Sequence, residues 1–222
     1  MTVTMESAER IWSLNIARNI VPTAKPQTFA RGKRGNFENR LDEVLRAAAR
    51  HFSEQGYRQA TLEDLAVALN VTRPALYHYA RSKDELAAKC SDIAKSQIQE
   101  AIVDALRLTT GREQLGAFFR RYAEIICDDF GRLFVLVNRR EYGPKLQETN
   151  RVLQREIDSD IRDMVRTGVV DGSLRDVDPA TVSRAMFGAF NGIPLWFRPG
   201  ARRSPGRIAD DFLVLLLTGV AP

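Results

Sequence analysis

One stretch of the sequence, residues 41–86, constrains the fold more than any other, because helix starts and stops follow one another closely along it. Apolar residues first recur there at three- and four-residue spacing, which marks one face of a helix. These residues are Leu41, Val44, Leu45, Ala48, Ala49 and Phe52. Gly56 follows them as a C-terminal stop. The first part of the stretch therefore predicts one amphipathic helix that ends near Gly56.

Signals for three further helices come next. Thr61 stands three residues before Asp64, a pair that resembles a capping box. Asn70 is one of the few non-glycine residue types that tolerate a left-handed conformation, so it marks a break. Thr72 and Ser82 are suitable N-caps for the two helices that follow.

Two helices joined by a turn of about four residues form a helix-turn-helix, an arrangement that places its second helix in the major groove of DNA. Ala66 occupies the position where the two helices cross, and its small side chain suits a close approach. A three-helix bundle of another function would show part of this pattern. The combination of caps, break and small crossing residue favours DNA binding.

Residues 44–86 also resemble the N-terminal domain of the TetR family of transcriptional regulators. The matching residues are Val44-Leu45, Ala47-Ala48, Phe52, Gly56-Tyr57, the run from Thr61 to Ala66, the run from Val71 to Tyr79, and the run from Ser82 to Leu86. Two departures concern packing. The family usually has Gly where this chain has Asn70, and Phe where it has Ala80, which leaves a gap that other side chains must fill.

The rest of the chain is helical by pattern, and no segment alternates with period two over more than a few residues. Helices are expected over 83–108, 112–129, 144–167, 179–195 and 205–220. A short segment that spans Leu133 to Tyr142 is expected after a break at Gly131. The fold class is therefore all-α. The resemblance implies a helix-turn-helix domain over residues 37–84 and a ligand-binding and dimerisation domain over 85–222, behind a basic extension at 1–36.

Charge is concentrated in that extension. Residues 1–36 hold six Lys/Arg and two Asp/Glu, so they carry most of the chain's net charge of +5. A basic tail on a near-neutral body often has a polyanionic partner. Arg31, Lys33 and Arg34 lie just before the first helix and are candidates for an arm in the minor groove. A merely solvated tail is the alternative.

The candidate DNA-binding residues lie on and around the second helix of the motif. Arg73 can contact guanine with two hydrogen bonds. Lys83 begins the following helix, where its charge and the helix N-terminus both favour a phosphate. The resemblance implies operator contacts at the matching positions, which are Thr61, Thr72, Arg73, Ala75, Tyr77, His78 and Lys83. For Tyr77 the alternative is surface packing.

A second and less specific resemblance concerns the effector. The stretch from Gly188 to Asn191-Gly192, the stretch from Leu195 to Gly200, and the run from Asp171 to Arg175 resemble TetR regulators that respond to acyl-CoA thioesters. A pocket for such a ligand needs an apolar tunnel and cations for phosphates. Candidates for the tunnel are Phe118, Tyr122, Ile126, Phe134, Met164, Phe187 and Trp196, and candidates for the cations are Arg121, Arg139 and Arg140. Asn191, in the first of the resembling stretches, is a further candidate for ligand binding. The alternatives are ordinary core aromatics, an Arg139-Arg140 surface pair with Glu141, and a drug-like effector.

The last two expected helices are unusually apolar for the end of a chain. Such a helix is buried in its own subunit or shared with a second one. Two helices from each subunit would form a four-helix interface in a homodimer, with Phe212, Leu213, Leu216 and Leu217 as its candidate face.

Other classes of protein fit the sequence poorly. An enzyme built on a helical bundle is the competing hypothesis, but His51 and His78 have no Cys or acid at suggestive spacing, so no catalytic residue or cofactor is expected. Cys90 and Cys127 are too few for a disulfide framework, and a cytoplasmic location without a metal site or a membrane span is expected. The sequence therefore predicts a ligand-responsive regulator, a repressor in the first instance, with double-stranded operator DNA, a second copy of itself and a small hydrophobic effector as partners.

Overall fold

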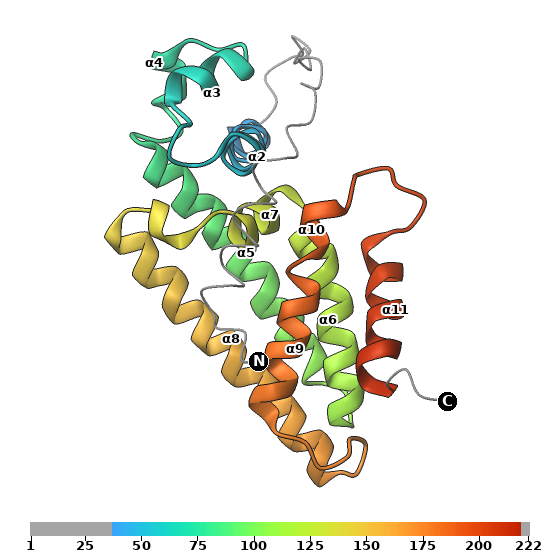
Figure 1. Ribbon diagram of the computed structural model, residues 1–222. Coiled ribbons are helices and arrows are strands. Elements are labelled where there is room, and N and C mark those ends of the chain that lie inside the picture. Colours follow the sequence, from blue (N-terminus) through green and yellow to red (C-terminus); the bar gives the residue numbers. More distant parts are fainter. Residues whose placement is uncertain (1–36, 219–222) are drawn as a thin grey trace, which may run out of the picture. The chain divides into compact units, whose positions relative to one another are not determined.

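The computed structural model of the protein describes residues 37–218, and no strand occurs among them. The elements are α2 (Phe37–Gln55), α3 (Leu62–Ala68), α4 (Arg73–Leu76), α5 (Lys83–Ala105), α6 (Gly111–Cys127), α7 (Asp129–Leu136), the 3-10 helix η1 (Arg139–Glu141), α8 (Pro144–Val170), α9 (Pro179–Phe190), α10 (Ile193–Trp196) and α11 (Pro205–Thr218) (Figure 1). The expected all-α fold is confirmed. The basic extension at 1–36, with Arg31, Lys33 and Arg34, lies outside the described residues.

The predicted N-caps of α3, α4 and α5 are all present. The Asp64 N–H donates to Thr61 Oγ1 at 3.1 Å, and the Thr61 N–H donates to Asp64 Oδ2 at 3.2 Å, which completes the capping box of α3. Asn70 has a φ of 51°, so the break between α3 and α4 uses the left-handed conformation that the residue type tolerates. Thr72 caps α4, and Ser82 caps α5.

Helix α4, the second helix of the motif, is short. It ends at Leu76, and the chain continues to Tyr79 in tight turns. The His78 N–H donates to the Ala75 carbonyl, and the Tyr79 N–H donates to the Leu76 carbonyl, so both bonds span three residues instead of four. Such bonds tighten the last turn of a helix. Ala80 follows and is buried.

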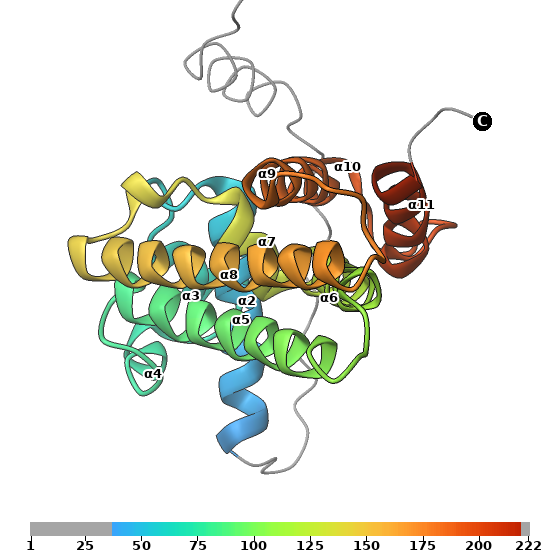
Figure 2. The ribbon, with the colours of Figure 1, turned by 90° about the horizontal axis from the view of Figure 1, so that it is seen from below.

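The C-terminal helices pack around α6. Helices α5 and α8 lie side by side, and α6 contacts both of them as well as α7 and α11 (Figure 2). The core between these helices contains Leu115, Phe118, Phe119, Ile126, Ile157, Ile161 and Met164. Within residues 37–218 no helix has the length and hydropathy needed to cross a membrane.

Two expected boundaries were wrong. Gly131 does not separate two segments but lies inside α7, where a Cβ atom would lie 2.0 Å from the Ile125 carbonyl oxygen. The glycine is needed because α7 crosses the end of α6 with no room for a side chain. The helix expected at 179–195 ends at Phe190, and the separate turn α10 begins at Ile193. Pro194 lacks the N–H that a continuous helix needs, which accounts for the break.

Ion pairs connect α2 to the start of α7. Arg46 donates to Asp128 at 3.0 Å and lies over the Phe130 ring at 4.8 Å, while Arg50 is 3.5 Å from Asp129. After the end of α2, the Tyr57 ring packs on Tyr142 with ring centroids 4.7 Å apart. The first helices of the described chain are therefore held to the C-terminal helices by both charged and aromatic contacts.

Candidate nucleic-acid interface

Helices α3 and α4 present the polar side chains that the sequence singled out. Thr61 is exposed, and its hydroxyl donates to Asp64 Oδ2 at 2.6 Å. Thr72 is also exposed, and its hydroxyl accepts from the Ala75 N–H at 3.4 Å. Ala75 is half-buried. The first role of both threonines is therefore to begin their helices.

Arg73 is the centre of an exposed cluster on α4. Its Nε and one terminal nitrogen donate to the Tyr77 hydroxyl at 3.3 and 3.0 Å, and its guanidinium lies 5.6 Å from the centre of the Tyr77 ring. The other terminal nitrogen forms an ion pair with Glu63 of α3. The Tyr77 hydrogen bond and the Glu63 charge raise the pKa of Arg73, so the cation is fully retained. The cluster therefore joins an arginine cation, an acid and a tyrosine hydroxyl on the surface.

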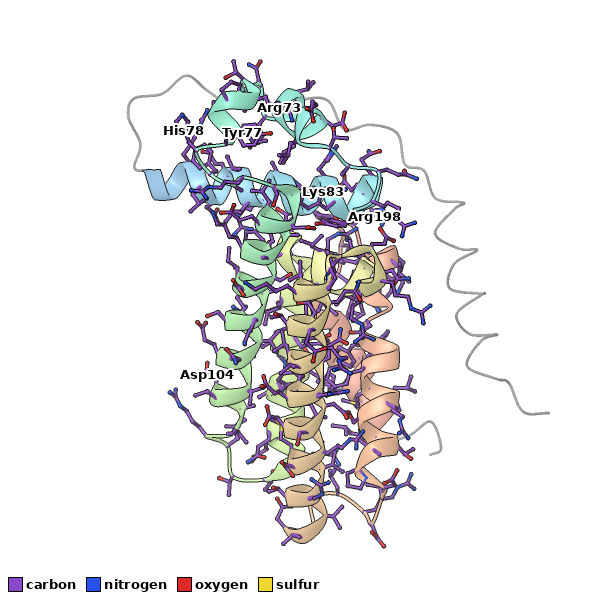
Figure 3. The ribbon with its side chains drawn as sticks, turned by 90° about the vertical axis from the view of Figure 1, so that its left-hand side faces the viewer. Arg73, Tyr77, His78, Lys83, Asp104 and Arg198 are labelled. Carbon is purple, nitrogen blue, oxygen red and sulfur yellow. The ribbon has the colours of Figure 1, made fainter. Side chains whose placement is uncertain are left out.

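The neighbouring residues complete an exposed row. Tyr77 is 42% exposed, and His78 is exposed beside it. Figure 3 shows Arg73, Tyr77 and His78 close together at α4, with Lys83 further along the chain at the start of α5. The structure thus brings together three of the predicted DNA-binding side chains on one surface.

Lys83 is placed differently from its neighbours. Its ammonium donates to the carbonyl oxygens of Tyr57, Arg58 and Ala60 at 3.0, 3.1 and 3.3 Å, and it lies 4.9 Å from the centre of the Tyr57 ring. These contacts hold the turn after α2 against the start of α5. Lys83 therefore has a structural role that the sequence did not predict, and its phosphate contact stays a prediction.

Four of the predicted effector residues lie together between α6 and α9. The rings of Phe118 and Tyr122 stack with centroids 5.5 Å apart, and Phe187 packs edge-on against Tyr122 at 5.5 Å. The Tyr122 hydroxyl donates to Asn191 Oδ1 at 2.7 Å, and burial raises the pKa of Tyr122 well above its usual range. Phe118, Tyr122, Phe187 and Asn191 are called the aromatic cluster below.

The remaining apolar candidates lie elsewhere. Ile126 of α6, Phe134 of α7 and Met164 of α8 are buried in the core. Trp196 is 53% exposed and lines a cavity of about 220 Å³ beside α11. The cavity is lined by Trp196, Phe197, Arg198, Ala201, Arg203, Ile208, Asp211 and Phe212. Trp196 therefore belongs to a different site from the aromatic cluster.

The candidate cations are not gathered at the aromatic cluster. Arg121 is exposed and pairs with Glu124 at 2.7 Å, one turn along α6. Arg139 and Arg140 are exposed on η1, where their neighbour Glu141 accepts from the Arg58 N–H at 3.2 Å. The alternative of an Arg139-Arg140 surface pair fits this placement better than a phosphate site does.

The exposed apolar side chains of α11 differ in part from the residues named as its candidate dimer face. Leu213 is buried in its own chain, and the Phe212 ring packs on Phe190 with centroids 5.6 Å apart. Leu217 is half-buried, and Leu216 is exposed. The outward apolar side chains are Val214, Leu215 and Leu216, with Leu215 48% exposed. Val214 and Leu215 were not among the residues named from the sequence, because a helix that is apolar on both sides does not mark its outer face. The residues of the dimer face stay a prediction.

A capped helix, a tight turn and a second, short helix that displays Arg73, with Tyr77 and His78 in the turn that follows, have the arrangement of a helix-turn-helix DNA-binding protein. The comparison with known families agrees. The family model described as bacterial regulatory proteins of the tetR family matches residues 44–90. A second family model, described as tetracyclin repressor-like, C-terminal domain, matches residues 108–220. The chain belongs to the TetR family of transcriptional regulators, and the family and its relatives are regulators and not enzymes.

Several relatives of the chain are transcriptional repressors. The chain is 29% identical to the HTH-type transcriptional repressor KstR2 of Rhodococcus jostii (strain RHA1), over 90% of this chain and 98% of that protein. It is 27% identical to KstR2 of Mycolicibacterium smegmatis, over 82% of this chain and 91% of that protein.

Solved structures share the fold. The TetR family regulator PfmR from Thermus thermophilus has a TM-score of 0.72 at 29% identity, over 82% of this chain and 97% of that one. AibR, solved in complex with isovaleryl coenzyme A and operator DNA, has a TM-score of 0.71 at 19% identity, over 80% of this chain and 98% of that one.

Proposed function

We propose that the protein is a ligand-responsive repressor, which binds a palindromic operator as a homodimer and leaves it when a small hydrophobic effector binds. The exposed row of Arg73, Tyr77 and His78 is the observation that carries the DNA-binding part. An arginine can donate to O6 and N7 of guanine, while tyrosine and histidine can hydrogen-bond to phosphates or base edges. Thr61, Thr72, Ala75 and Lys83 flank the row, and Arg31, Lys33 and Arg34 would reach the adjacent minor groove.

Arg73→Ala is expected to weaken operator binding by about 1–3 kcal/mol, or about 5- to 150-fold, and to relax the preference at one base position. The duplex to use is the one selected by the wild-type protein from a random library, and gel shifts give the affinities. Arg107→Ala, a matched change of an exposed arginine just after the end of α5, should leave the affinity unchanged. Wild-type affinity and base preference in the Arg73 variant would disprove the assignment.

The dimer is proposed to form through the outward faces of α9 and α11. Val214, Leu215 and Leu216 are exposed apolar side chains on α11, and Ala185 and Gly188 are small exposed residues on α9, beside the exposed Arg184. Small residues on one helix and large apolar ones on the next suit close helix packing between copies. A two-fold dimer places two recognition helices about 34 Å apart, one turn of DNA.

The effector is proposed to be a coenzyme A thioester whose acyl part enters between α6 and α9. Support comes from the aromatic cluster and from the isovaleryl coenzyme A bound to AibR, which shares the fold. The acyl part would separate Phe187 from Tyr122 and compete with the Tyr122–Asn191 hydrogen bond. Ile126, Phe134 and Met164 remain candidates for the wall of this pocket, and Arg121 of α6 for its phosphate contacts. Trp196 lines the separate cavity beside α11, and Arg139 and Arg140 lie on η1.

The effector is expected to raise the dissociation constant for DNA by about 5- to 150-fold, the usual range of coupling between two sites. Isovaleryl, long-chain and steroid-derived thioesters are added to the protein–DNA complex, with coenzyme A alone and the free acids as controls. Phe187→Ala should raise the effector concentration for half release about tenfold, because one aromatic contact is lost. DNA binding without effector should stay unchanged.

The effector assignment has two further outcomes. If Trp196→Ala raises the effector concentration for half release and Phe187→Ala does not, the effector binds in the cavity beside α11 instead of at the aromatic cluster. No release and no change in melting temperature with any thioester would exclude coenzyme A thioesters. A hydrophobic drug-like effector would then take their place.

A further inference from the structure

Arg73 is not free on the surface of α4 but is held from two sides. Tyr77 accepts two of its N–H groups, at 3.3 and 3.0 Å, and lies under its guanidinium. Glu63 of α3 holds a third through an ion pair. Helix α3 therefore contributes a charged partner to the side chain proposed to read the DNA.

Glu63 lies in the first turn of α3, where an acid is favourable, and Arg73 is its ion-pair partner. The Glu63 side chain is 53% exposed, and the capping box of α3 is made by Thr61 and Asp64 instead. An exposed acid next to a DNA-reading arginine faces the phosphates, where a negative charge opposes binding. Such a residue lowers the affinity for DNA of any sequence. Its presence is understandable if it improves the discrimination between sequences.

We propose that Glu63 is a specificity-determining residue, which together with Tyr77 orients the Arg73 guanidinium toward a base edge and keeps it from nearby phosphates. The proposal rests on Arg73 as a base-contacting residue, as proposed above. Arginine binds phosphate and guanine with the same donors, so an unrestrained side chain finds phosphate on any sequence. When Glu63 and Tyr77 hold the Arg73 guanidinium, its remaining N–H groups point in one direction and can contact DNA in one orientation only.

Glu63→Gln removes the charge and keeps the shape of the side chain. The variant is expected to bind a shuffled duplex about two- to fivefold more tightly, the range that exposed ion pairs give. On that duplex, the slope of the logarithm of the binding constant against the logarithm of the salt concentration should steepen by about 0.9 for each Arg73 that gains a phosphate contact. The affinity ratio between selected and shuffled duplexes should fall by a similar factor, with the preference relaxed at the base position that Arg73→Ala also affects.

A double-mutant cycle with Arg73→Ala separates this role from a general effect of charge. Glu63→Gln should not change the base preference when Arg73 is already alanine, because it acts through that side chain. Glu54→Gln removes the same charge from an exposed acid on α2 and should leave the base preference unchanged. Melting temperatures check the fold, and Glu63→Ala is a second neutral variant that must show the same relaxation.

The possible results are distinguishable. Base preference altered by Arg73→Ala but untouched by Glu63→Gln and Glu63→Ala would overturn the role of Glu63 and leave the proposed function standing. Base preference untouched by Arg73→Ala would overturn both, because Arg73 would not contact a base. Relaxation by Glu63→Gln that persists in the Arg73→Ala background would also overturn the proposal, since Glu63 would then act on DNA directly.

Discussion

Leu215→Arg is expected to convert the protein into a monomer and to weaken operator binding by about 100-fold or more, because two linked half-site contacts become one. Leu215 lies on α11 between Val214 and Leu216, which are also exposed. An arginine there would be buried without a partner in the proposed dimer, which costs several kcal/mol. Light scattering measures the mass in solution, and a gel shift measures the affinity.

Leu106→Arg is the matched control for this change. Leu106 is also an exposed leucine, 52% exposed, but it lies at the C-terminal end of α5, away from α9 and α11. A cation is favourable at that end of a helix, so this variant should remain folded and dimeric. A Leu215→Arg protein with the mass and the affinity of the wild type would show that the dimer uses another surface.

Gly131→Ala is expected to lower the free energy of unfolding by about 3 kcal/mol, at the upper end of the cost of overpacking a core. The added methyl group would meet the Ile125 carbonyl oxygen and the Ile126 Cα, which are backbone atoms that cannot rotate away. Helix α7 would have to move away from α6. A fall of about 6–12 °C in melting temperature is the corresponding shift for a protein of this size.

Gly116→Ala, on the neighbouring helix α6, is expected to raise the free energy of unfolding, whereas Gly131→Ala lowers it. Gly116 lies within α6 with no atom within 4 Å of the position of a Cβ. Alanine there should stabilise the helix by about 0.5–1 kcal/mol, because it restricts the unfolded chain. A similar effect of the two substitutions would contradict the tight α6–α7 crossing.

The helix-turn-helix was predictable because its signals are local. Thr61, Asp64, Asn70 and Thr72 each act on backbone groups within four residues of themselves, so the sequence contains both partners of each interaction. The all-α class followed for the same reason from apolar periodicity. The boundary between domains at residues 84 and 85 stays a prediction.

The errors and omissions concern contacts between distant residues. Lys83 binds carbonyl oxygens more than 20 residues earlier in the chain, and Gly131 is placed by the path of α6. Glu63 meets Arg73 only because the turn at Asn70 brings α3 and α4 together. Spacing along the sequence does not reveal such pairs, so the structure is needed to find them.

The contacts between α2 and α7 have a consequence for exchanging parts between relatives. Arg46, Arg50 and Tyr57 all find partners outside the helix-turn-helix, at Asp128, Asp129 and Tyr142. A chimera that receives residues 37–84 alone would leave Arg50 without Asp129, Arg46 with Asp42 as its ion-pair partner but without Asp128, and one face of the Tyr57 ring uncovered. Residues 37–84 are therefore not a freely exchangeable module, and a transplant that keeps its stability has to include Asp128, the first turn of α7 and Tyr142.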